Sequence, residues 1–163
     1  MENFILHPIG KISTCGGDVK LILDQQYTPA LQGLDGFGYV QIIWWFDGCD
    51  NQESRGTLTE EKPYTKGPDM LGTFATRSPN RPNPLALTSA YVTYVDHERG
   101  VVGLAYIDAN DGSPVLDIKP YTPSLDCVEH PIVPQWCAHW PHCTESSGSF
   151  DWDKEFNFQG LNR

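Results

Sequence analysis

The segment Arg77–Pro84 constrains the fold of this chain most, because it holds three prolines, two arginines and two asparagines in eight residues. Proline fixes φ, lacks an amide donor and pushes the preceding residue towards extended geometry. The segment therefore predicts a stiff, extended loop that pairs poorly within a sheet. Strand-like apolar sequence flanks it on both sides. Its arginines either hold a small anionic or polar ligand or cap backbone carbonyls in an ordinary connection, and composition favours neither reading.

Short apolar segments separated by turn residues indicate β-structure in most of the remaining chain. We expect strands at residues 4–12, 19–23, 39–46, 70–76, 85–96, 101–107 and 115–118. One short helix is expected at residues 27–34, with Thr28 as its N-cap and Pro29 in its first position. The polar residues 47–69 predict a long exposed loop. The fold class is mainly β, an antiparallel barrel or sandwich with one short helix and an irregular C-terminal tail.

Composition narrows the class of protein further. The 163 residues suit one domain with a tail, and 11 basic against 21 acidic residues give a formal net charge of −10. That charge disfavours nucleic-acid binding, which depends on neutralising phosphates. No apolar run approaches transmembrane length, no signal peptide is evident, and five cysteines do not suggest a disulfide framework. We expect a cytoplasmic protein with free thiols and with neither membrane nor DNA as a partner.

A second polar segment, residues 108–121, places three aspartates, a lysine and a tyrosine around a tight turn. Asp111 and Gly112 form a common hairpin turn pair, which accounts for both of them. Asp117 and Lys119 share one side of the strand that follows, directly before Pro120 and Tyr121. This pair is either an ion pair on a solvated face or part of a binding site.

Together, the two polar segments resemble the TsaA-like (TrmO) family of S-adenosylmethionine (AdoMet)-dependent methyltransferases. The matching runs are Gly72-Thr-Phe-Ala-Thr-Arg-Ser-Pro, then Arg81-Pro-Asn-Pro, and finally Asp111-Gly-Ser-Pro-Val with Asp117-Ile-Lys-Pro-Tyr. The resemblance implies a single-domain antiparallel β-barrel over residues 1–123 that binds AdoMet, usually as a homodimer. Residues 124–163 would then be an irregular extension that packs on the barrel or on a partner subunit.

The resemblance also implies which residues contact the cofactor. They lie at the end of the aromatic strand, in the arginine–proline loop and in the Asp–Gly turn. The expected contacts are Phe46, Asp47, Gly48, Arg77, Arg81, Pro82, Asn83, Pro84, Leu85, Asp111, Gly112, Ser113 and Pro114. AdoMet suits such a set, since its carboxylate favours a bidentate arginine, its cationic groups favour carboxylates or carbonyls, and its adenine favours an apolar wall. Asp117 and Tyr121 are the candidates for orienting or deprotonating the methyl acceptor.

The methyl acceptor is open. The best-characterised family activity is methylation of the exocyclic amine of threonylcarbamoyladenosine in tRNA. This chain departs from the tRNA enzymes at residues 11–18, which lack a longer basic stretch, and at Asp47-Gly48. We also expect a short paralogue without the additional C-terminal domain of many bacterial members. With the acidic charge, these departures leave a small-molecule methyltransferase and a non-catalytic AdoMet-binding sensor as alternatives.

Three cysteines and three histidines lie within residues 127–143. Their spacing matches no zinc finger, and the interleaved Trp and Pro residues indicate packing, so no metal site is predicted. A metal-binding interaction protein is the last alternative function. Residues 150–158 alternate aromatic and polar side chains, a pattern that suits an edge strand, a cover over the site or an exchange with a partner subunit.

Overall fold

The computed structural model describes residues 4–157, and the chain divides into two compact units. Unit 1 combines Met1–Asn51 with Asn83–Cys127, and unit 2 combines Gln52–Pro82 with Val128–Arg163. Each unit therefore joins segments that are distant in sequence. The division into domains at residues 1–123 and 124–163, and the packing of the extension on the barrel or a partner subunit, stay predictions.

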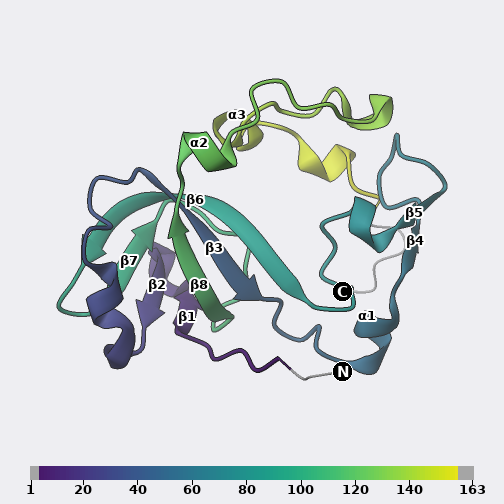
Figure 1. Ribbon diagram of the computed structural model, residues 1–163. Helices are drawn as coiled ribbons and strands as arrows, with labels where there is room; N and C mark the ends of the chain where they lie inside the picture. The colour runs from purple at the N-terminus through teal and green to yellow at the C-terminus, as the bar shows by residue number, and fades with distance from the viewer. Residues whose placement is uncertain (1–3, 158–163) are drawn as a thin grey trace. The chain divides into compact units, whose positions relative to one another are not determined.

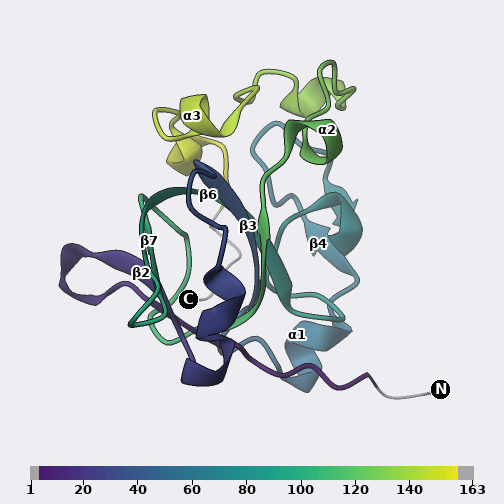
Figure 2. The same ribbon diagram turned by 60° about the vertical axis from the view of Figure 1, so that its left-hand side comes forward.

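Unit 1 is a closed antiparallel β-barrel with the strand order β1-β2-β7-β6-β3-β8 (Figure 1). Figure 2 turns the molecule so that β2, β7, β6 and β3 can be followed around the barrel. The strands are β1 (Gly10–Ser13), β2 (Val19–Leu23), β3 (Tyr39–Trp45), β6 (Leu85–Asp96), β7 (Val101–Leu104) and β8 (Pro114–Pro120). Pairing of β1 with β8 closes the sheet and removes its edges. The prediction of a mainly β protein with an antiparallel barrel is confirmed.

The helices of unit 1 are short: η1 (Cys15–Gly17), η2 (Gln25–Leu31) and α2 (Pro123–Asp126). The predicted N-cap of the helix expected at residues 27–34, which corresponds to η2, is wrong. Asp24 occupies the N-cap position, and Thr28 lies inside a 3-10 helix that also contains Pro29. The short 3-10 form suits this position, because proline lacks the amide that a longer α-helix would use. No helix within residues 4–157 is long and apolar enough to cross a membrane.

Strand β3 shows how the barrel interior is filled. Its alternate side chains Val40, Ile42 and Trp44 are 0%, 0% and 3% exposed. On the neighbouring β6, the buried positions are the small residues Ala86 and Ala90. Trp44 pairs with Ala86 and Val40 pairs with Ala90, and the Trp44 Nε1 donates a hydrogen bond to Thr88 Oγ1 at 3.0 Å. The pairing of one large side chain with small neighbours gives the core its density.

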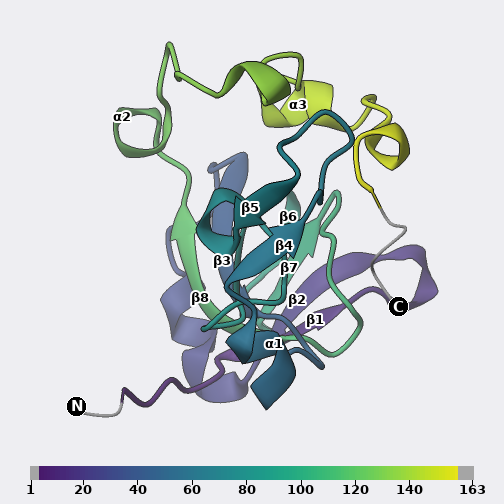
Figure 3. The same cartoon turned by 90° about the vertical axis from the view of Figure 1, so that its right-hand side faces the viewer.

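Unit 2 has little regular structure. Its elements are α1 (Gln52–Gly56), β4 (Thr59–Glu61), β5 (Met70–Gly72), η3 (Thr73–Ala75), η4 (Gln135–Cys137), α3 (Thr144–Ser147) and η5 (Trp152–Lys154). Figure 3 shows β4 and β5 side by side as an antiparallel pair. The prediction of a loop without structure at residues 47–69 is wrong, because that range contains α1 and β4. The strand predicted at residues 70–76 ends at Gly72, since Thr73 Oγ1 donates to Thr57 O at 2.9 Å and the chain turns there.

Aromatic rings form the centre of unit 2. Tyr64 stacks on Trp136 with ring centroids 5.2 Å apart, meets Trp140 at 5.0 Å and contacts Phe156 at 5.7 Å. A single antiparallel bridge joins Tyr64 to Phe156, so the edge strand considered for residues 150–158 is reduced to one contact. Phe158 lies outside the described residues. The C-terminal extension and residues 52–82 thus share one aromatic core.

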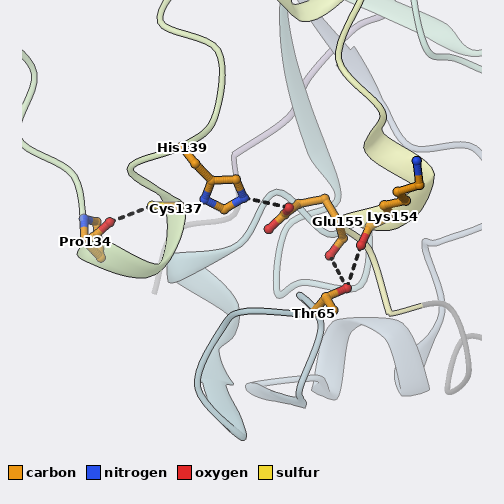
Figure 4. A network of polar contacts seen from close by, with 6 residues as sticks. All are labelled: Thr65, Pro134, Cys137, His139, Lys154 and Glu155. Carbon is orange, nitrogen blue, oxygen red and sulfur yellow. Dashed lines mark hydrogen bonds and ion pairs between the residues drawn. The ribbon is translucent and has the colours of Figure 1, made fainter.

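A buried carboxylate borders this core (Figure 4). The Glu155 side chain is 5% exposed, and its Oε2 lies 2.8 Å from His139 Nε2. Burial raises the pKa of Glu155, but the Trp140 indole and the His139 ring lower it by more, and the net shift is downward. Trp140 Nε1 and Glu155 Oε1 are both buried, and neither has a hydrogen-bond partner among the described residues.

We expect the Gly10→Ala substitution to destabilise the barrel by about 1–3 kcal/mol, because strained packing of this size typically has that effect. A Cβ atom at Gly10 would lie 2.2 Å from the Ile22 carbonyl oxygen, a backbone atom that cannot swing away. Gly38→Ala is the matched control, since its nearest neighbour would be a Tyr91 ring carbon at 3.8 Å. Urea unfolding of both variants measures the difference, and equal stabilities would contradict the packing argument.

The pKa of Glu155 makes a prediction about acid stability. A carboxyl whose folded pKa lies below its ordinary value of 4.5 stabilises the fold above that pH, and the contribution is lost as pH falls through the folded pKa. Glu155→Gln should therefore lose less stability than the wild type when the pH is lowered from 7 to about 3. Urea unfolding followed by tryptophan fluorescence measures this change. Glu129→Gln, at an exposed position, is the control; the same pH dependence in both variants would refute the assignment.

Candidate functional site

One end of the barrel brings together three of the predicted cofactor segments. In the sheet, Trp45 pairs with Leu85 and Trp44 pairs with Val115, so the end of β3 adjoins the starts of β6 and β8. Figure 1 shows β3 and β8 running side by side in opposite directions. We call these segments the barrel-end cluster: Phe46–Gly48, Asn83–Leu85 and Asp111–Pro114. The cluster follows from the antiparallel pairing, since neighbouring strands begin where their partners end.

The first segment of the barrel-end cluster is a tight turn. The Cys49 amide donates to the Phe46 carbonyl at 3.2 Å, and Gly48 has a φ of 81°, which favours glycine at this position. The Phe46 amide donates to the Pro84 carbonyl at 2.9 Å, which ties the turn to the second segment. The Phe46 ring is half-buried and meets Trp44 edge to face at 4.8 Å. The turn therefore fixes the backbone of two consecutive residues, Phe46 with an apolar ring and Asp47 with an exposed carboxylate.

The third segment is anchored to the end of β1. Asp111 Oδ1 accepts a hydrogen bond from the Thr14 amide at 2.8 Å, and the Ile12 amide donates to the Ser113 carbonyl at 2.9 Å. The Thr14 hydrogen bond, followed by one from Cys15, lowers the pKa of the Asp111 carboxyl. The carboxylate of Asp111 thus holds the turn in shape. Gly112, with a φ of 85°, provides the left-handed residue that the turn requires.

Ser113 presents a buried polar atom without a partner. Its side chain is 0% exposed, and its Oγ forms no hydrogen bond with any described residue. An unpaired buried hydroxyl costs about 1–3 kcal/mol, so such an atom calls for a specific reason. A polar group of a ligand at the barrel-end cluster would supply the missing partner.

The arginine–proline loop is held by its own arginine. Arg81 Nε donates to Ser78 O at 2.7 Å, and Arg81 Nη2 donates to Thr76 O at 2.8 Å and to Thr73 O at 3.4 Å. Arg81 therefore caps backbone carbonyls, one of the two roles that composition left open. Arg55 Nη1 adds a further bond to Pro82 O at 2.7 Å. These contacts, like Arg77, belong to unit 2, whereas Asn83, Pro84 and Leu85 belong to unit 1.

The two predicted catalytic residues do not lie in the barrel-end cluster. Asp117 Oδ2 forms an ion pair with Lys119 Nζ at 2.6 Å, and both side chains are about half exposed, at 46% and 59%. Asp117 raises the pKa of Lys119. The Tyr121 amide donates to the Tyr39 carbonyl at 3.0 Å, at the opposite end of β8 from Pro114. Seven residue steps along a strand cover roughly 23 Å, so the structure separates Tyr121 from the cluster.

The cysteines and histidines of the extension have other contacts. Cys137 is buried and its Sγ donates to Pro134 O at 3.3 Å, while His139 pairs with Glu155 (Figure 4). Within residues 4–157, no group of three or more His, Cys, Asp or Glu side chains is placed to hold a metal ion. Tyr64, which receives three aromatic contacts, was not singled out from the sequence. The one feature of the sequence that pointed to Tyr64 was a large aromatic side chain within the otherwise polar residues 47–69.

Comparison with known protein families gives a match over the barrel strands. The family model for the tRNA-methyltransferase O N-terminal domain matches residues 8–127, which include all three segments of the barrel-end cluster. An S-adenosyl-L-methionine-binding protein of Archaeoglobus fulgidus is 32% identical over 119 residues, covering 73% of this chain and 78% of that protein. The tRNA (adenine(37)-N6)-methyltransferase of Escherichia coli is 34% identical over 121 residues, covering 73% of this chain.

The lengths of the relatives differ. This chain spans 51% of the E. coli enzyme, but its match covers 97% of a probable S-adenosyl-L-methionine-binding protein of Methanocaldococcus jannaschii. Among solved structures, TrmO from Pseudomonas aeruginosa is similar with a TM-score of 0.65 and 26% identity, over 83% of this chain and 62% of that one. The resemblance to the TsaA-like family is thereby confirmed: the chain belongs to the tRNA-methyltransferase O N-terminal domain family.

Proposed function

We propose that this protein is an AdoMet-dependent methyltransferase that binds its cofactor at the barrel-end cluster. The observation that carries the proposal is the buried, unpaired Ser113 hydroxyl within that cluster. Family membership supports it, since relatives are named S-adenosyl-L-methionine-binding proteins and tRNA methyltransferases. We also propose a homodimer, which the family resemblance implies, and a cytoplasmic location, which the composition of the sequence suggests.

The residues present suit the chemistry of AdoMet. In unit 1, the half-buried Phe46 ring offers an apolar wall, the exposed Asp47 carboxylate offers a partner for a cation, and Ser113 offers a hydroxyl. In unit 2, we propose that the Arg77 guanidinium binds a carboxylate, as the family resemblance implies, while Arg81 donates to three backbone carbonyls. We further propose Pro82, Asn83, Pro84, Leu85, Gly112 and Pro114 as contacts through their backbone or apolar surface.

Methyl transfer requires chiefly alignment. When bound, AdoMet supplies an electrophilic methyl group, and the protein must hold the acceptor in line with it. The rigid turns at Gly48 and Gly112 favour such alignment, because both are fixed by backbone hydrogen bonds. Asp117 and Tyr121 stay proposals for orienting or deprotonating the acceptor. Tyr121 lies at the other end of β8 from Pro114, whereas Asp117 lies three residues after Pro114 on that strand.

A second candidate function is AdoMet binding without catalysis. It is favoured by the absence of Asp117 and Tyr121 from the barrel-end cluster, and by the names of the shorter relatives, which refer to binding only. The net charge of −10 favours a small-molecule acceptor over tRNA if the protein is an enzyme.

We expect Arg77→Ala to weaken AdoMet binding at least tenfold, because a charge-assisted contact to a carboxylate contributes roughly 1.5–3 kcal/mol. Isothermal titration calorimetry measures the affinity, and urea unfolding shows that the fold persists. Arg99→Ala is the matched control, since Arg99 is 83% exposed on the turn between β6 and β7. Unchanged binding by Arg77→Ala would remove this residue from the site.

The Ser113→Ala substitution tests the buried hydroxyl. Because Oγ has no partner among the described residues, its removal should leave the free protein as stable as before or more stable. AdoMet affinity should fall about fivefold if the cofactor supplies that partner. Urea unfolding and calorimetry measure the two effects, with the exposed Ser124→Ala as control. Lower stability without a change in affinity would mean that the hydroxyl is structural.

The acceptor is tested by release of S-adenosylhomocysteine from AdoMet. We expect release in the presence of either tRNA bearing threonylcarbamoyladenosine or a small-molecule extract, and the arm that responds identifies the acceptor class. Binding of AdoMet without release in either arm would support the non-catalytic function. Arg77→Ala protein, which should bind poorly, serves as the control for contaminating activity.

A further inference from the structure

The C-terminal extension belongs to the same compact unit as the arginine–proline loop. The family match ends at residue 127, so residues 128–157 lie beyond it. Even so, these residues share unit 2 with residues 52–82, which the family match includes and which carry Arg77 and Arg81. The extension is therefore packed against a segment for which we propose a role in cofactor binding.

Tyr64 is where the extension meets that segment. It is 6% exposed, and three rings from the extension surround it: Trp136, Trp140 and Phe156. The backbone on either side is bound as well, since the Asn157 amide donates to Pro63 O at 3.0 Å and the Thr65 amide donates to Glu155 O at 2.8 Å. Aromatic contacts of this kind each add about 0.5–1.5 kcal/mol beyond the area that they bury. The position of the Tyr64 ring is therefore set by the extension.

The hydroxyl of Tyr64 reaches the arginine–proline loop. Burial raises the pKa of Tyr64, and a hydrogen bond from the backbone of Arg77 lowers it in part, so the Tyr64 hydroxyl lies against the Arg77 amide. Four residues further on, Arg81 binds the carbonyls of Ser78 and Thr76. The loop is thus held by one of its own residues, Arg81, and by Tyr64 from an earlier part of the chain. Tyr64 therefore contacts Arg77, the residue that we propose binds the AdoMet carboxylate.

We propose that Tyr64, held by Trp136 and Trp140, is a positioning residue that orients Arg77 for the carboxylate of AdoMet. This inference rests on the proposed function and deepens it. The physical reason is that an unbraced loop samples several backbone orientations, and binding must then restrict them at a cost in affinity. Residues 128–157, which lie outside the family match, would in this way raise the affinity of Arg77, which lies within the match, for AdoMet.

The decisive variant is Tyr64→Phe, which keeps the ring contacts and removes only the hydroxyl. We expect AdoMet affinity to fall about fivefold, as for the loss of one hydrogen bond. Hydrogen exchange of the Arg77 amide should become faster because that amide loses its acceptor, whereas the fall in AdoMet affinity is the effect that a purely structural role would not produce. Trp136→Ala should weaken binding similarly, and Trp136→Phe should restore part of it.

Phe150→Leu is the matched control, because Phe150 contacts Trp152 and His139 in the same core. It should lower stability to urea without changing AdoMet affinity, with all binding measured at a temperature where circular dichroism shows each variant to be folded. Wild-type affinity and wild-type exchange at Arg77 in Tyr64→Phe would overturn the inference. If Arg77→Ala itself binds AdoMet normally, the proposed cofactor contact fails instead, so the two failures are distinguishable.

Discussion

The pairing of β3 with both β6 and β8 is the constraint on which the barrel and its end depend. Three side chains of β3, Val40, Ile42 and Trp44, fill the interior, and each contributes roughly 1.5–3 kcal/mol or more by burial. The same pairing places Leu85 beside Trp45 and Val115 beside Trp44. The strands that create the core therefore also decide where the turns after β3, before β6 and before β8 meet. The position of the proposed cofactor site at the barrel end therefore follows from the register of the sheet.

Unit 2 is stabilised in a different way. It has few strands and short helices, and aromatic rings with a buried carboxylate replace an aliphatic core. The stability of such a core depends on the partners of its buried polar groups. Glu155 is nearly enclosed, and its carboxylate interacts with His139 and with the nearby Trp140 indole. The loop that carries Arg77 and Arg81 belongs to this unit. Its conformation therefore depends on residues of the extension that no motif connects to a cofactor.

Some elements were predicted correctly from the sequence and others were not. The alternation along residues 39–46 and 85–96 predicted two strands that the structure confirms almost to the residue, because a half-buried strand imposes period two. Asp111-Gly112 does form a turn, but the hairpin that this pair indicates was wrong, because β7 and β8 are not neighbours in the barrel. The cap at Thr28 was misplaced, and the strand at residues 70–76 was too long, because side-chain bonds such as that of Thr73 to Thr57 are not visible in a local pattern.

The sequence by itself determined the β class, the turns rich in glycine and proline and the family resemblance, since each depends on local periodicity or on short motifs. Only the tertiary structure decided that Phe46, Pro84 and Ser113 share one end of the barrel while Tyr121 lies at the other. It alone showed that Arg81 is engaged with carbonyls, that Ser113 Oγ lacks a partner among the described residues, and that Tyr64 is enclosed by rings from the extension. The reason is physical: strand register and contacts between distant segments arise from packing, which no short stretch of sequence records.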